Sequence, residues 1–147
     1  MAISASGIYG LSLEKALIDT LGESWEAEDN KIALVSDSYT PNFDTHDFFN
    51  DLTNEVTGTN WASGGVALTG TEITLSSGVL TFDATDVSVA STTLSSAMAG
   101  VYYTNVGSSA TDQLILLTDF VNAVSTSAGT FGIQFSASGI ATLDYTP

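Results

Sequence analysis

From residue 66 onward, apolar and polar residues alternate in short runs, and turn-forming residues separate the runs. Successive side chains of a β-strand point to opposite faces, so this period of two predicts strands with one buried face. We predict one hairpin from residues 71–75 and 80–84 around Ser76-Ser77-Gly78. Residues 131–135 and 140–145, joined by a turn at Ser138-Gly139, give the clearest hairpin pattern.

Two other runs, residues 98–103 and 113–120, are apolar on both faces and are typical of interior strands. The Ser/Thr-rich residues 91–96 and the small, polar residues 122–129 are predicted to be loops. About eight or nine short strands result, with turns at the spacing of a sandwich or barrel. Because the intervals are too short for helical crossovers, the pairing should be antiparallel. The predicted fold is mainly β, an antiparallel β-sandwich or jelly-roll-like Greek key.

One or two short helices are predicted in the N-terminal third. Residues 12–21 carry a leucine stripe at i, i+4 and i+8 (Leu13, Leu17, Leu21), with Ser12 as a possible N-cap and Gly22 at the end. The stripe either packs on the core or forms a partner-binding face. The loop that follows is acidic around Trp25, which we expect to cover the edge of the core.

Residues 31–65 are predicted to form a strand, an irregular segment and a second short helix. The strand is residues 32–35, and Pro41 ends it because proline has no amide hydrogen to donate. Asp44 is the expected N-cap, with Asp47 at N3 and a hydrophobic staple between Phe43 and Phe48. The apolar face of this helix would then consist of Phe48, Phe49, Leu52 and Val56, with Gly58 at its end.

The 147 residues are enough for one domain with a substantial core. Within residues 1–147 we expect an N-terminal arm (1–10), a mixed helix, strand and loop segment (11–60) and a β body (61–147). The arm is either a loose terminus or an edge strand. The absence of cysteine excludes disulfides and thiolate chemistry. No apolar run approaches the about 20 residues of a membrane span, and the N-terminus does not read as a signal peptide.

Charge is scarce and unbalanced: 17 acidic residues stand against two lysines, Lys15 and Lys31, and the net charge is −15. Affinity for phosphate backbones grows with the cations that a protein supplies. A chain with two lysines and no arginine therefore has no nucleic-acid footprint, and its net charge repels anionic membranes. We expect neither nucleic acid nor membrane as a partner.

No catalytic pattern stands out, and we predict neither an enzyme nor a cofactor. His46 is the only histidine, and no G-x-S-x-G turn accompanies it. Asp44, Asp47 and Asp51 are weak candidates for a cation site because calcium prefers carboxylate oxygens. The EF-hand spacing is absent, however, so a capping or solvated role is favoured for these acids.

Several segments taken together resemble a family of small, β-rich virion proteins of tailed bacteriophages. The resemblance rests on YTPN, FDTH and EVTGT in that order, followed by Gly64-Gly65, and on the FDA and DV residues between Phe82 and Val87. It extends through VLTFDATDVSVASTTLSSAMAGVYY to GTFGIQFSASGIATLDY and covers most of residues 31–145.

The resemblance implies a structural virion protein, foremost a head decoration (cement) protein. Such a protein would lie on the outer surface of the capsid, bind the major capsid protein, associate with itself as a homotrimer and tie neighbouring capsid subunits together. The alternative is a minor tail or fibre-associated protein with a host-glycan-binding module, for which the candidate aromatic residues are Trp25, Trp61, Tyr102 and Tyr103. The candidate partner-binding residues are Ile3, Ile8, Tyr9, Leu13, Leu17, Trp25 and Trp61.

Overall fold

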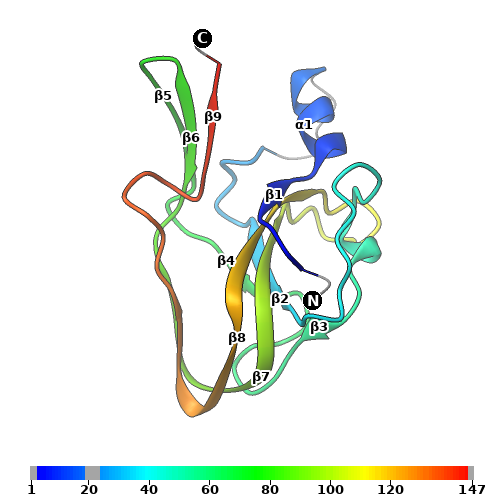
Figure 1. Cartoon of the computed structure of the whole chain (residues 1–147), viewed down its shortest axis with the longest axis vertical. Helices are drawn as coiled ribbons and strands as arrows, with labels where there is room; N and C mark the ends of the chain where they lie inside the picture. Colours follow the sequence, from blue (N-terminus) through cyan, green and yellow to red (C-terminus); the bar gives the residue numbers. More distant parts are fainter. Residues whose placement is uncertain (1–2, 19–23, 146–147) are drawn as a thin grey trace.

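The computed structural model describes residues 3–18 and 24–145 and is mainly β, with two antiparallel sheets in a sandwich-like arrangement and one α-helix in the N-terminal part (Figure 1). The larger sheet has the strand order β1-β8-β7-β2-β3, with β4 also paired to β2, and the smaller sheet has the order β5-β6-β9. The elements are β1 (Gly7–Ile8), α1 (Gly10–Leu17), β2 (Lys31–Val35), the 3₁₀ turn η1 (Phe49–Asp51), β3 (Glu55–Val56), β4 (Val66–Ala67), β5 (Glu72–Ser76), β6 (Val79–Asp83), β7 (Val87–Tyr103), β8 (Leu114–Ile133) and β9 (Ala141–Asp144).

The central part of the larger sheet, formed by β2 and the adjoining ends of β7 and β8, is buried on both faces, which explains why these segments are apolar on both sides. In β2, Ile32 and Leu34 belong to one core cluster, and Ala33 and Val35 belong to the other. The first cluster also contains Trp25, Phe82 of β6 and Phe131 from the far half of β8. The second is covered by the N-terminal arm and the segment 39–52. The predicted strand at 32–35 and the two predicted interior strands are confirmed.

β7 and β8 form one long antiparallel ribbon, from Val87↔Ile133 at one end to Tyr103↔Leu114 at the other. In Figure 1 the ribbon curves at the bottom of the view and continues up the left side toward the smaller sheet. The predicted loops at 91–96 and 122–129 are therefore wrong, because both segments are strand. Their small hydroxyl residues mark irregular pairing instead: the register shifts repeatedly here, and left-handed backbone occurs at Ser91, Ser96 and Ala128.

The smaller sheet contains the predicted hairpin of β5 and β6, which is confirmed. Ser76 pairs with Val79, and the two turn residues Ser77 and Gly78 both have positive φ (51° and 82°), as a type I′ turn requires. The hairpin predicted from residues 131–135 and 140–145 is wrong. Its turn exists as a single bridge between Ser136 and Gly139, but β8 pairs with β7 and β9 pairs with β6.

Helix α1 starts two residues earlier than the leucine stripe predicted. Ser12 lies inside the helix, where it is buried, and its hydroxyl oxygen accepts a hydrogen bond from Trp25 Nε1 at 3.3 Å. Leu13 is half-buried, whereas Leu17 is 79% exposed, so the stripe does not pack as a whole on the core. Leu21 lies outside the described residues.

The predicted helix from Asp44 onward is wrong. Residues 43–45 form a turn, in which Asn42 Oδ1 accepts hydrogen bonds from the amides of Asp44 and Thr45 at 3.1 and 3.2 Å. Only η1 is helical, and Val56 lies in β3. The aromatic residues find partners elsewhere: Phe43 packs on Tyr9, and Phe49 packs on Tyr103, with ring centroids 5.2 and 4.4 Å apart. Tertiary packing therefore overrides the local helical pattern.

The N-terminal arm is an edge strand that docks on its own chain. β1 pairs with β8 through Gly7↔Leu117 and Ile8↔Leu116. Ile3 and Tyr9, which flank β1, are fully buried in the second core cluster. The arm is thus part of the folded unit.

Candidate binding groove

An apolar cavity of about 260 Å³ lies between α1 and one face of the smaller sheet. These two parts stand at the same end of the molecule in Figure 1, on opposite sides of the view. The walls of the cavity come from α1, from the loop around Trp25 and from all three strands of the sheet. The lining residues are Ile8, Leu13, Ala16, Leu17, Ser24, Trp25, Ile73, Leu80, Phe82, Ala141, Thr142 and Leu143.

Strand register explains why one sheet face is apolar. Leu75, Leu80 and Leu143 are opposite one another across β5, β6 and β9. Ile73, Phe82 and Ala141 form the next row. Side chains two residues apart share a face, so both rows lie on the same side of the sheet. The opposite face carries mostly polar residues of the same strands, among them Glu72, Thr74, Thr81 and Asp144.

The chain covers this apolar face only in part. Trp25 packs edge-on against Phe82, with ring centroids 6.2 Å apart. Beyond this contact, Leu75 is 62% exposed, Leu143 is 41% exposed and Leu17 is 79% exposed. Large exposed apolar side chains gathered in one place, rather than scattered singly, mark an interaction site.

The cavity continues into a longer groove. Ile8, Ala141 and Thr142 also line a second hollow of about 240 Å³, which runs beside β1 and β8. Thr118 and Ile140 in turn connect that hollow to a third, of similar size, which reaches Phe135. We call these three adjoining hollows the groove. It is elongated, with its most apolar part at α1.

Carboxylates are the only charged side chains beside the groove among the described residues. Glu26 follows Trp25 and accepts a hydrogen bond from the Ile73 amide at 2.9 Å. Asp119 lines the third hollow. Both lysines are placed elsewhere. Lys31 is on β2 in the larger sheet.

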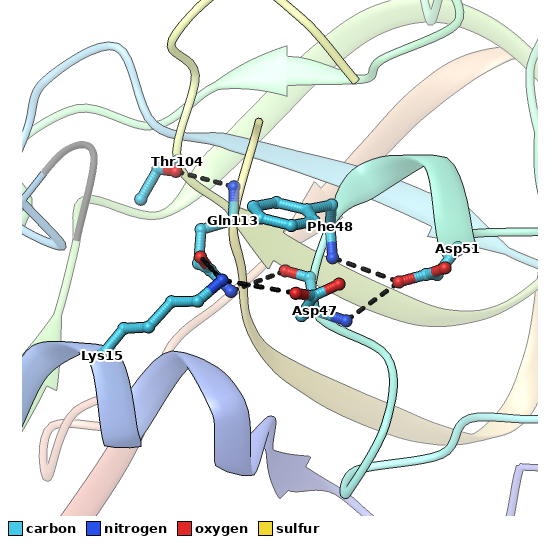
Figure 2. Close-up of polar contacts among 6 residues, drawn as sticks. All are labelled: Lys15, Asp47, Phe48, Asp51, Thr104 and Gln113. Carbon is cyan, nitrogen blue, oxygen red and sulfur yellow. Dashed lines mark hydrogen bonds and ion pairs between the residues drawn. The ribbon is translucent and has the colours of Figure 1, made fainter. Parts of the chain in front are cut away.

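Lys15 lies on α1, and its side chain reaches toward Asp47 and Gln113 (Figure 2). Its ammonium group donates to Asp47 Oδ2 at 3.3 Å and to Gln113 Oε1 at 2.9 Å, and it lies 4.1 Å from the centre of the Phe48 ring. These contacts hold α1 against the segments that carry Asp47 and Gln113. The one cation on α1 is therefore engaged within the chain.

The structure separates the seven predicted partner-binding residues into two groups. Ile8, Leu13, Leu17 and Trp25 all line the cavity. Ile3, Tyr9 and Trp61 are fully buried within this chain and have no surface to offer a partner in this structure. The sequence pattern gave no sign that the apolar face of β5, β6 and β9 would complete the site, because alternation predicts a common face but not whether it is covered.

Of the three acids considered for a cation site, Asp47 and Asp51 make contacts within the chain, and Asp44 is exposed. Asp51 Oδ2 accepts hydrogen bonds from the amides of Asp47 and Phe48 at 2.9 and 3.2 Å (Figure 2). Burial acts to raise the pKa of Asp51, but these hydrogen bonds and the nearby His46 outweigh it and leave the pKa below its usual value. Within residues 3–18 and 24–145, no group of three or more metal-ligating side chains comes together.

His46 belongs to a hydrogen-bonded chain that sequence reasoning missed. The Tyr9 and Tyr39 hydroxyls are 2.9 Å apart, and the Tyr39 hydroxyl is 2.9 Å from His46 Nδ1. Burial raises the pKa of both tyrosines, so both stay neutral. This chain fastens the arm to the segment 39–46. The three residues are too far apart in sequence for any local motif to reveal it.

The aromatic residues considered for a glycan platform are not on the surface. Trp25, Trp61, Tyr102 and Tyr103 are all buried. Burial raises the pKa of Tyr102 and of Tyr103. Tyr145, which follows β9, is exposed.

Comparisons with protein-family models, with curated proteins and with solved structures find no significant match to this chain. Over the part of the chain that the structure describes, no helix has the length and apolar character needed to cross a membrane.

Proposed function

We propose that this chain is a structural attachment protein of a tailed-phage virion, specifically a decoration (cement) protein on the outer surface of the head. The observation that carries the proposal is the groove, because its exposed apolar side chains form a surface suited to another protein. The resemblance to small, β-rich virion proteins supplies the identity of the assembly. The proposal assigns no catalytic step to the chain.

The net charge of −15 fits a position outside the shell. A protein with two lysines has no means of holding packaged DNA, and its negative field keeps it away from polyphosphate. Attachment must then come from apolar contact and from partner groups that match its acids. In this proposal the groove binds the major capsid protein, and self-association as a trimer would use other surfaces.

The test is attachment to purified particles. Virions of the encoding phage are prepared without this protein, heads and tails are separated, and labelled protein is added to each. We expect saturable binding to heads at a fixed ratio to the major capsid protein. Binding to tails alone, or to neither fraction, would overturn the proposal. A glycan array run with the same protein distinguishes the tail-adhesion alternative, for which the buried aromatic residues offer no platform.

A further inference from the structure

We infer that the groove takes an extended, apolar segment of a partner protein that also carries lysine or arginine. This inference rests on the proposed function and specifies the chemistry of the partner at the same site. Three observations lead to it: the shape of the groove, the charges beside it and the poor fit of a second copy of this chain.

The shape favours a polypeptide over a compact ligand. Small-molecule pockets are about 300–1,000 Å³ and enclose most of their ligand. The cavity at α1 is smaller, at about 260 Å³, and Leu17 and Leu143 on its walls remain open to solvent. The groove then continues past Ile8 and Thr118 through two further hollows. An extended chain can place one apolar side chain in each hollow, whereas a compact ligand fills only one.

The charges favour a cationic segment. Asp119 lines the groove, Glu26 accepts a hydrogen bond from the Ile73 amide at the cavity wall, and no cationic side chain of the described residues lines any of the three hollows. Interfaces pair surfaces of opposite potential, which raises the association rate and excludes partners of like charge. A lysine or arginine next to the inserted apolar residues would meet these carboxylates. An acidic segment would be repelled.

The same charges disfavour a second copy as the occupant. Any surface segment of this chain comes from a molecule with 17 acids and two lysines, and Lys15 is already bound to Asp47 and Gln113. Two copies meeting at the groove would bring acids against acids without compensating cations. The occupant is therefore a different protein.

Short synthetic peptides of defined pattern test this inference on the intact protein. The probe alternates leucine with lysine. One control alternates leucine with glutamate, and the other alternates serine with lysine. Binding is measured by calorimetry at physiological salt, and by tryptophan fluorescence, since Trp25 lines the cavity while Trp61 is fully buried away from it. We expect the leucine–lysine peptide to bind at least about tenfold more tightly than either control.

Paired variants test whether the leucine–lysine peptide binds in the groove. Leu17→Ser combined with Leu143→Ser should weaken the leucine–lysine peptide by about tenfold or more, whereas Val106→Ser combined with Val121→Ser, which also removes exposed apolar side chains, should not. Asp119→Lys should weaken binding more than Asp44→Lys, which makes the same change of charge at a position that does not line the groove.

Three results would overturn the inference: equal binding of the leucine–glutamate peptide, equal effects of the groove and control variants, or self-association in ultracentrifugation that the peptide competes away. The outcome is separable from the proposed function. Attachment to heads without peptide binding would refute the partner chemistry alone, whereas peptide binding without attachment to heads would refute the virion role alone.

Discussion

At the scale of single residues, one position can affect stability strongly. This happens where a side chain accepts hydrogen bonds from backbone amides, or where a nearby backbone atom leaves no room for a side chain. Asp51 is one case, since its carboxylate accepts from two amides in the turn before η1. Gly65 is another. A Cβ there would collide with the Ile32 carbonyl, and its φ of +69° is unfavourable for other residues. Neither role was predicted from the sequence. The Asp51 contacts are local but belong to a turn where a helix was predicted, and the approach of Gly65 to Ile32 depends on segments brought together by the fold.

The first prediction concerns Asp51. Asp51→Asn should lower the free energy of unfolding at pH 7 by about 1–2 kcal/mol, because hydrogen bonds to a charged acceptor are replaced by weaker ones. Urea denaturation measures this loss. Asp44→Asn is the control, with an expected change within about 0.5 kcal/mol. The Asp44 side chain is exposed, and the side chain that closes this turn is that of Asn42.

The pH dependence of the same contact has a defined sign. The folded-state pKa of Asp51 is lowered, so its contribution is fully present above the unfolded pKa of about 3.9 and disappears as the pH falls through the folded pKa. The unfolding free energies of the native chain and of Asp51→Asn should therefore converge below about pH 4. A difference between the two unfolding free energies that stays constant down to about pH 2 would contradict this account.

The second prediction compares two glycines. Gly65→Ala should cost more than about 3 kcal/mol, because it combines a backbone collision with an unfavourable φ. Gly107 has a positive φ as well (+95°), but a Cβ added there would meet no atom within 4 Å, so Gly107→Ala should cost only about 1–2 kcal/mol. Thermal unfolding of both variants gives the comparison, and equal losses would show that the close approach at Gly65 is absent.

At the scale of elements, the sequence predicted those strands whose pattern is decided locally. The β5–β6 hairpin follows from alternation around a two-residue turn, and β2 follows from a run of buried apolar residues. The polar halves of β7 and β8 did not look like strands, because their hydroxyl residues are stabilised by cross-strand contacts such as Thr92 Oγ1 to Thr126 Oγ1 at 2.8 Å. Such pairing depends on the long-range register and leaves no local signal.

The third prediction concerns the N-terminal arm. Tyr9→Ala should lower the free energy of unfolding by about 3–5 kcal/mol, since the side chain is fully buried and its hydroxyl bonds to Tyr39. Ser4→Ala, at an exposed position on the same arm, should have little effect.

Removal of residues 1–10 should therefore weaken attachment to heads through loss of the fold. If the truncated protein melts at the native temperature, the arm is not the structural element described above.

At the scale of the whole molecule, the groove depends on three parts that no single stretch of sequence connects. Leu13 and Leu17 on α1 were predicted as a possible partner-binding face. The opposite wall was not predicted, because β9 was assigned to a hairpin with β8 rather than to the sheet with β6. The acidic surface, in contrast, could be predicted from composition alone, because a chain with 17 acids and two lysines carries a large excess of negative charge.

The fourth prediction uses this charge. If the occupant of the groove is cationic, attachment to heads should weaken as salt is raised from about 0.1 M to 1 M, where the Debye length falls from about 10 Å to about 3 Å. The loss should be partial, because the apolar contact remains. Titrations at several salt concentrations measure it. Attachment that strengthens with salt would indicate a purely apolar contact and would contradict the role of Glu26 and Asp119.

Site-specific photocrosslinking on assembled heads tests the central claim most directly. A photoreactive residue replaces Leu17 in the groove or, as the matched control, the similarly exposed Val121 outside it, and crosslinked peptides are identified by mass spectrometry. We expect the probe at position 17 to capture a segment of the major capsid protein with apolar and basic residues, and the probe at position 121 not to capture that segment. Crosslinks from position 17 only to this chain itself, or none to any head protein, would contradict the claim that the groove attaches the protein to the head.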